Sequence, residues 1–126
     1  MKKFKLTIAK VKKAGLEALK NNTMQICAKA SCESGDCANS MMVGKKEYTC
    51  VIGAALPKKL RQHKKCSTIS IKGLFRVQEV LSVSDVEYVK LQKLQDLHDG
   101  MVNQVRYSQL SVKEAKKQMK KLLEDL

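Results

Sequence analysis

The sequence is poor in aromatic residues, which make up 4% of the chain and include no tryptophan. It contains one proline and six glycines, so residues that interrupt helices are few. A core with few aromatic rings must be built from Leu, Val, Ile, Ala and Met, which suits packed helices better than a sandwich or barrel. At 126 residues the chain fits a single domain, residues 1–126. We therefore predict a mainly α fold, a compact bundle of four to five helices, with room for a small two-stranded β element in residues 23–71.

Long apolar runs are also missing. No run approaches the ~18 consecutive residues that a membrane span needs. The first six residues, Met1–Leu6, start like a signal peptide, but Lys10, Lys12 and Lys13 interrupt the apolar segment that should follow. We therefore expect no membrane association and a cytoplasmic location. Five cysteines in a chain without an export signal are expected to be reduced thiols.

The cysteines lack the spacing of a structural zinc site. Such sites usually contain a Cys-x-x-Cys knuckle, and here the only tight pair is His63 with Cys66. Metal binding and disulfides therefore stay as alternatives to buried or free thiols. The sequence also has no phosphate-binding loop, dinucleotide motif or Ser-His-Asp set. We predict a protein that is not an enzyme and that uses no cofactor and no metal.

Acidic residues are scarce, and the chain carries a net charge of +13. The excess is uneven, because residues 1–20 carry seven lysines against Glu17, whereas residues 77–99 carry five acidic residues against two lysines. A field of this sign attracts polyanions such as DNA, RNA or acidic proteins. The predicted polyanion-binding residues are Lys58, Lys59, Arg61, Lys64 and Lys65, together with Lys12 and Lys13. Lysine outnumbers arginine, the better residue for specific phosphate recognition, so a role in solubility alone is the alternative.

The first half of the chain contains signals for two helices. Residues 7–20 fit a helix with Thr7 as its N-cap, although the alternation over residues 4–8 also fits a short strand. Residues 48–56 form an apolar run rich in small residues, which should be buried. The proline that follows this run is tolerated at the first turn of a helix, and it favours a short basic helix over residues 58–65.

Two capping boxes mark helices in the last third of the chain. Ser84 and Ser111 are each followed three residues later by a glutamate, the pattern of a helix N-terminus. Gly100 predicts the end of the first of these helices. The second, residues 111–126, is amphipathic. We interpret this helix as an element added to the C-terminus of the domain. Its apolar face is also a candidate surface for a homodimer.

Two motifs carry a resemblance to known proteins. One reads Cys-x-Ile-Gly-x-x-Leu-Pro over residues 50–57, and the other reads Leu-Gln-x-Leu-His-Asp over residues 94–99. With Cys37 upstream and a preceding helix, they resemble a family of small phage and prophage proteins. The resemblance implies a phage-like setting, the host cytoplasm and a role in host takeover or counter-defence, and it implies no particular reaction. After the proline the family tends toward acidic residues, whereas this chain continues with Lys58-Lys59-Leu60-Arg61.

The two motifs also predict a contact. Cys50 and Gly53 are expected in a buried turn, and Gln95, His98 and Asp99 at the end of a helix, where the turn and the imidazole ring can pack together. We interpret this contact as a structural latch. A ligand pocket or a catalytic Cys-His pair is the alternative.

The functional prediction follows from the charge and the resemblance together. We predict a non-enzymatic, phage-type accessory protein that binds a host protein or a nucleoprotein complex. Two alternatives stay open. The first is direct DNA or RNA binding through a basic surface, and the second is binding of a small molecule or nucleotide around Cys50 and His98.

Overall fold

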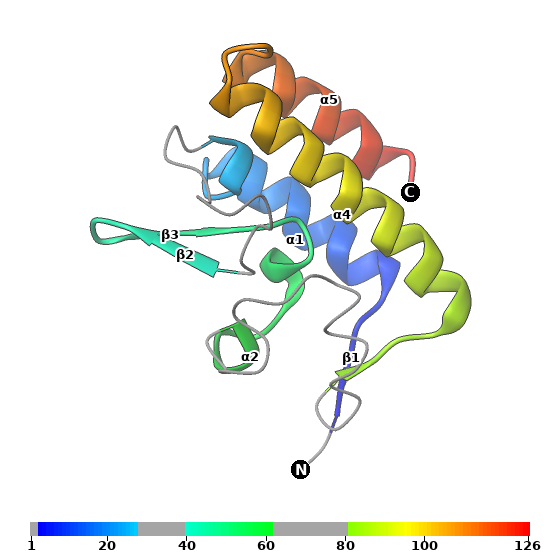
Figure 1. Cartoon of the computed structure of the whole chain (residues 1–126). Helices are drawn as coiled ribbons and strands as arrows, with labels where there is room; N and C mark the ends of the chain where they lie inside the picture. Colours follow the sequence, from blue (N-terminus) through cyan, green and yellow to red (C-terminus); the bar gives the residue numbers. More distant parts are fainter. Residues whose placement is uncertain (1–2, 28–39, 62–80) are drawn as a thin grey trace.

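The computed structural model describes residues 3–27, 40–61 and 81–126 (Figure 1). Its elements, with η for short 3-10 helices, are β1 (Phe4–Lys5), α1 (Ile8–Lys20), η1 (Gln25–Cys27), β2 (Ser40–Val43), β3 (Lys46–Thr49), η2 (Gly53–Ala55), α2 (Lys58–Arg61), β4 (Leu81–Ser82), α4 (Asp85–Arg106) and α5 (Val112–Glu124). Helices dominate this part of the chain, which confirms the predicted mainly α fold. None of the helices described here has the length and apolar character needed to cross a membrane.

Three helices, α1, α4 and α5, form the body of the protein (Figure 1). α5 packs against both α1 and α4, η1 lies against α4 and α5, and η2 lies against α1. The β2–β3 hairpin extends away from these helices in Figure 1. Because α5 packs against α1, the first and last long helices of the chain lie side by side, although they are far apart in the sequence.

The predicted N-terminal helix is confirmed as α1. The Thr7 side chain accepts a hydrogen bond from the Lys10 backbone N–H at 3.2 Å, so Thr7 is the N-cap as expected. At the other end Asn21 is the C-cap. Gly15 lies on the buried face, where a Cβ would come within 2.9 Å of both δ-carbons of Leu123. The absence of a side chain at this position lets α5 approach α1 closely.

Two short pairs of strands accompany the helices. β2 and β3 are antiparallel, with Ser40 opposite Thr49, and they are joined by a turn in which Gly44 has a φ of +63°. This hairpin confirms the small two-stranded element predicted within residues 23–71. β1 and β4 form a second, parallel pair that joins Phe4 to Leu81. The sequence left a strand and a helix as alternatives near the N-terminus, and the structure contains both, with β1 directly before α1.

The prediction that the helix from Ser84 ends at Gly100 is wrong. Its start is as predicted, because the Ser84 hydroxyl accepts a hydrogen bond from the Glu87 backbone N–H. The helix, however, continues through Gly100 to Arg106. A glycine inside a helix costs about 1 kcal/mol relative to alanine, and burial of Met101 and Val102 in the next turn offsets that cost. The motif around His98 consequently lies in the interior of α4, not at its end.

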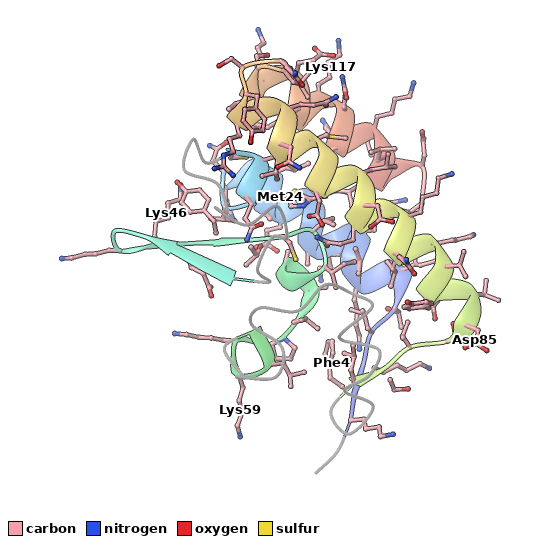
Figure 2. The ribbon with its side chains drawn as sticks, viewed as in Figure 1. Phe4, Met24, Lys46, Lys59, Asp85 and Lys117 are labelled. Carbon is pink, nitrogen blue, oxygen red and sulfur yellow. The ribbon has the colours of Figure 1, made fainter. Side chains whose placement is uncertain are left out.

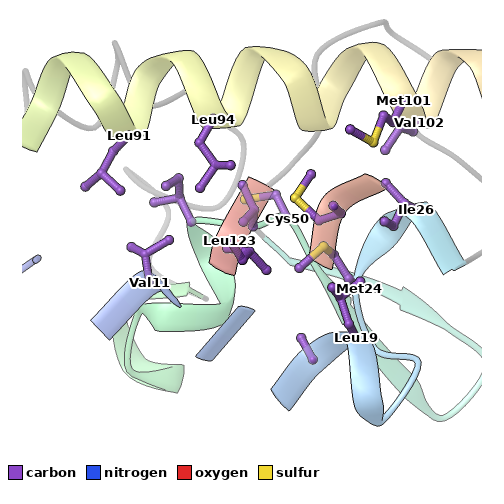
Figure 3. Packing of buried hydrophobic residues seen from close by; sticks show 14 of the residues in the cluster. Val11, Leu19, Met24, Ile26, Cys50, Leu91, Leu94, Met101, Val102 and Leu123 are labelled. Carbon is purple, nitrogen blue, oxygen red and sulfur yellow. The ribbon is translucent and has the colours of Figure 1, made fainter. Parts of the chain in front are cut away.

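The core is built from aliphatic residues and methionine, as the shortage of aromatics requires (Figure 3). Leu91, Leu94, Met101 and Val102 of α4 face a layer from the other elements, with Cys50 between them. The apolar run after β3 is buried as predicted. On α5 the fully buried side chains are Ala115, Met119 and Leu123. The apolar face of the C-terminal helix therefore belongs to the common core.

Candidate functional site

A groove runs between α1 and α5 on the surface that the two helices share. Its volume is about 570 Å³. Leu16, which is half-buried, and Leu19, which is buried, form its apolar floor. The rest of the lining comes from Lys20, Lys116, Lys117, Lys120 and Glu124. We call this feature the lysine groove.

The helical repeat explains why lysines gather there. Ala115, Met119 and Leu123 point into the core, so the residues that follow each of them turn toward α1. Two of these following residues are lysines, at 116 and 120, and the third is Glu124. The apolar face that holds α5 in the fold therefore also fixes the position of its basic side.

The positive charge of the groove is largely uncompensated. Among the described residues that line it, four are lysines and one, Glu124, carries a carboxylate. In the part of the chain that the structure describes, no ion pair joins a carboxylate to Lys20, Lys117 or Lys120. The Lys12 ammonium donates a hydrogen bond to the backbone oxygen of Glu124 at 3.1 Å and so adds a further positive charge beside the end of α5. Such a cluster attracts anionic groups, most strongly at low ionic strength.

The predicted polyanion-binding residues lie on different elements. Lys58 and Lys59 begin α2, and Arg61 ends it, whereas Lys12 and Lys13 belong to α1. The start of a basic helix after the proline is confirmed, and Lys64 and Lys65 lie outside the described residues. Figure 2 shows Lys59 and Lys117 at opposite ends of the molecule. The contact between Lys12 and Glu124 connects the N-terminal lysines to α5.

The turn that contains Cys50 contacts α4 through Gln95, whereas the packing of this turn on the His98 ring stays a prediction. The Gly53 backbone N–H donates to the Cys50 Sγ at 3.0 Å, which closes the turn that leads into η2. The Ile52 backbone N–H points to the Gln95 Oε1 at 3.4 Å, a long hydrogen bond between this turn and α4. Cys50, Ile52, Gly53 and Gln95 are all buried. The structure therefore brings both sequence motifs together.

On the side of α4, one carboxylate organises the latch. The Gln95 Nε2 donates to the Asp99 Oδ1 at 2.8 Å, and the His98 Nδ1 lies 3.0 Å from the same oxygen. Since a carboxylate only accepts, Nδ1 carries the ring proton in this contact. His98 is fully buried, and among the described residues its Nε2 has no hydrogen-bond partner. The imidazole thus contributes packing volume in the interior together with one polar contact.

The Cys50 thiol is held in its protonated form. Burial, with a smaller contribution from the nearby Asp99 carboxylate, raises its pKa to about 12, against the lowering effect of the Gly53 N–H. A thiol with this pKa is a poor nucleophile and a poor metal ligand at neutral pH. Cys27 is a half-buried thiol and Cys50 a buried one, and the other cysteines with His63 lie outside the described residues. Within the described ranges no three His, Cys, Asp or Glu side chains are grouped to hold a metal ion.

Sequence reasoning missed the lysines of the groove. Lys116, Lys117 and Lys120 were expected only as the polar side of an amphipathic helix. The sequence does contain a signal for them. Lys116 and Lys120 are four residues apart, as are Leu16 and Lys20 on α1, so each pair lies along one face of its helix. The spacing does not, however, predict which two helices pack against each other.

Comparison with known proteins adds no family to these observations. No protein-family model matches the chain, and no curated protein or solved structure is significantly similar to it. The resemblance to small phage proteins therefore stays an interpretation of two motifs.

Proposed function

We propose that this protein is a non-enzymatic binding protein whose lysine groove takes an acidic segment of a partner protein. The observation that carries the proposal is the combination of an apolar floor, Leu16 and Leu19, with lysines that have no ion-pair partner among the described residues. A segment with apolar residues on one side and Glu or Asp beside them is complementary to both features. With the motifs that resemble phage proteins, the partner class is a host protein or a nucleoprotein complex.

Two features of the groove favour an acidic protein over nucleic acid. Stacking of single-stranded bases needs exposed aromatic rings, and none of the described residues that line the groove is aromatic. Phosphate groups are bound most specifically by the guanidinium fork of arginine, whereas the basic residues in the described lining of the groove are all lysines. The leucines of the floor cannot form favourable contacts with a charged phosphate backbone, but they can bury apolar side chains of a peptide.

The latch supports a binding role over catalysis. Cys50, the one cysteine in the latch, is fully buried and its thiol is protonated at neutral pH. The imidazole of His98 is also fully buried. The chemistry of this cluster therefore suits a structural contact between the turn and α4 better than a nucleophilic pair.

The test uses a fluorescent acidic peptide as the probe. The peptide is helical, about 15 residues long, with leucines at i, i+3 and i+7 and glutamates elsewhere. A second peptide replaces the leucines with serine, and single-stranded DNA and RNA oligonucleotides of matched charge complete the set. Fluorescence anisotropy at physiological salt measures the four affinities for the full chain. We expect the leucine-containing acidic peptide to bind most tightly.

Two double variants locate the binding surface. Lys117→Glu with Lys120→Glu reverses two charges in the groove, and Lys58→Glu with Lys59→Glu makes the same change in net charge on α2. We expect the groove variant to lose about tenfold or more in peptide affinity and the α2 variant to lose much less. Equal losses would mean that net charge alone attracts the peptide and would overturn the proposal. Tighter binding of an oligonucleotide than of either peptide would replace it with nucleic-acid binding.

A further inference from the structure

The lysine groove has two distinct ends, because the helices that form it run in opposite directions. The Lys116 ammonium donates a hydrogen bond to the Asn22 Oδ1, so it lies beside the end of α1 that carries Lys20. Near the start of α1, the Lys12 ammonium reaches the backbone oxygen of Glu124 at 3.1 Å. The beginning of α5 therefore lies beside the end of α1, and the end of α5 lies beside its beginning.

The two ends of the groove differ in charge. Lys20, Lys116 and Lys117 gather where α1 ends and α5 begins, which we call the lysine end. At the opposite end, the glutamate end, the described lining contributes Glu124, and Lys12 lies next to it, so these two charges largely cancel. The dipoles of two antiparallel helices also oppose each other, which leaves the side chains to set the gradient. An anionic group is therefore attracted most strongly to the lysine end.

The walls of the groove suit a helical segment better than an extended one. The described lining residues belong to α1 and α5, and the backbone N–H and C=O groups inside an α-helix are already bonded within it. An extended segment on the apolar floor would bury backbone groups without partners, whereas a helix bonds its own. Lys116 and Glu124 are ~12 Å apart along α5, which is about the rise of two helical turns. The groove therefore fits about two turns of a docked helix.

We propose that the segment bound in the lysine groove is an amphipathic helix that docks in one direction, with its C-terminal turn and its carboxylates at the lysine end. This inference rests on the proposed function, because it specifies the acidic segment that the groove takes. The C-terminus of a helix carries a partial negative charge, which adds to that of the carboxylates there. The N-terminus of the docked helix, with its unbonded N–H groups, then lies beside the Glu124 carboxylate, which accepts hydrogen bonds. The docked helix is parallel to α1 and antiparallel to α5.

The reverse direction is unfavourable at both ends of the groove. The partial positive charge of the helix N-terminus would face the lysines, and the free carbonyl groups of its C-terminus would face Glu124. Each contact between a charge and a helix end changes an affinity by about two- to fivefold. The groove therefore discriminates between two helices that differ only in which end carries the acidic residues.

Two peptides of identical composition test this discrimination. Each is about 12 residues long, with leucines at i, i+3 and i+7, blocked termini and the same hydrocarbon staple on the opposite face, so that both are helical before they bind. One carries its glutamates in the last turn and glutamines in the first turn, and the other has them exchanged. Fluorescence anisotropy with the full chain should show about threefold or tighter binding of the peptide with C-terminal glutamates. Equal affinities, or the opposite preference, would overturn the proposed direction.

Glu124→Lys tests whether the charge gradient sets the direction. This variant makes both ends of the groove positive, so both peptides should bind at least as tightly as before, while the difference between them shrinks. Asp96→Lys on α4 makes the same change in net charge outside the described lining of the groove, and it should leave the preference unchanged. A preference that survives in Glu124→Lys would overturn the role of the gradient.

A nitroxide label on the peptide reports the direction itself. In NMR spectra of the isotope-labelled protein, a label at the peptide C-terminus should broaden the amide signals of Lys20 and Lys116, and a label at its N-terminus those of Lys12 and Glu124. The reverse pattern, or the same pattern with both labels, would contradict the proposed direction while leaving the lysine groove as the binding site. Failure of both peptides to bind would instead overturn the proposed function together with this inference.

Discussion

Gly15 of α1 packs directly against Leu123 of α5, since a Cβ on Gly15 would lie 2.9 Å from both δ-carbons of the leucine. Leu123 is fully buried, so its side chain has little room to move. The contact joins the first long helix of the chain to the last one. The residues that follow the two contacting residues in the sequence, Leu16 and Glu124, line the lysine groove.

This contact predicts opposite effects for two identical substitutions. Gly15→Ala should lower the free energy of unfolding by about 1 kcal/mol, because overpacking against Leu123 exceeds the gain in helix propensity. Gly100→Ala, in a helix interior with open space around it, should raise the free energy of unfolding by about 0.5–1 kcal/mol. Urea denaturation of both variants at low protein concentration measures the difference. A gain in stability from Gly15→Ala would show that α5 can shift without cost.

The packing role of His98 predicts a second pair of outcomes. His98→Ala should cost about 2–4 kcal/mol, as other substitutions that leave a cavity in a core do. His98→Leu retains most of the volume and removes the unpartnered Nε2, so it should cost clearly less. Guanidinium denaturation of both variants provides the comparison. Equal losses in the two variants would indicate that the contact with Asp99, not the volume, is what His98 contributes.

Cys50 predicts a loss of stability at high pH. Its folded pKa of about 12 lies above the ordinary 9.0 of an unfolded thiol, so the folded state favours the protonated form. The resulting stabilisation is complete below pH 9.0 and is lost as the pH rises toward 12. Melting temperatures between pH 8 and 11 should therefore fall more steeply for the unchanged protein than for Cys50→Ala. Parallel curves would contradict this role of the thiol.

Glu87 predicts a loss of stability in acid. Its carboxylate accepts a hydrogen bond from the Ile8 backbone N–H at 2.8 Å, and this bond, with a second one from Ser84, lowers the pKa below the ordinary 4.5. A lowered pKa stabilises the fold above pH 4.5, and this stabilisation is lost as the pH falls through the folded value. Glu87→Gln should be less stable than the unchanged protein at pH 7, with a difference that narrows toward pH 3. A difference in stability between the two proteins that stays constant from pH 7 to pH 3 would show that ionisation of Glu87 does not stabilise the fold.

Local features of the sequence determined where most helices begin. Thr7, Ser84 and Ser111 are each the N-cap that their spacing predicts, because capping depends on residues within one turn. The buried run after β3 and the mainly α class also followed from the sequence. The residues that form the latch were likewise singled out from the motifs alone.

The tertiary structure decided what local signals leave open. Glycine commonly follows the last residue of a helix, but α4 continues beyond Gly100 because Met101 and Val102 are buried in the core. This burial is evident only in the packed structure. The pairing of β1 with β4 joins residues far apart in sequence, and no local pattern predicts such a contact. The lysine groove exists because α1 and α5 became neighbours through Gly15 and Leu123. Caps and periodicity act over a few residues, whereas the choice of neighbouring helices depends on how all the apolar faces are buried together.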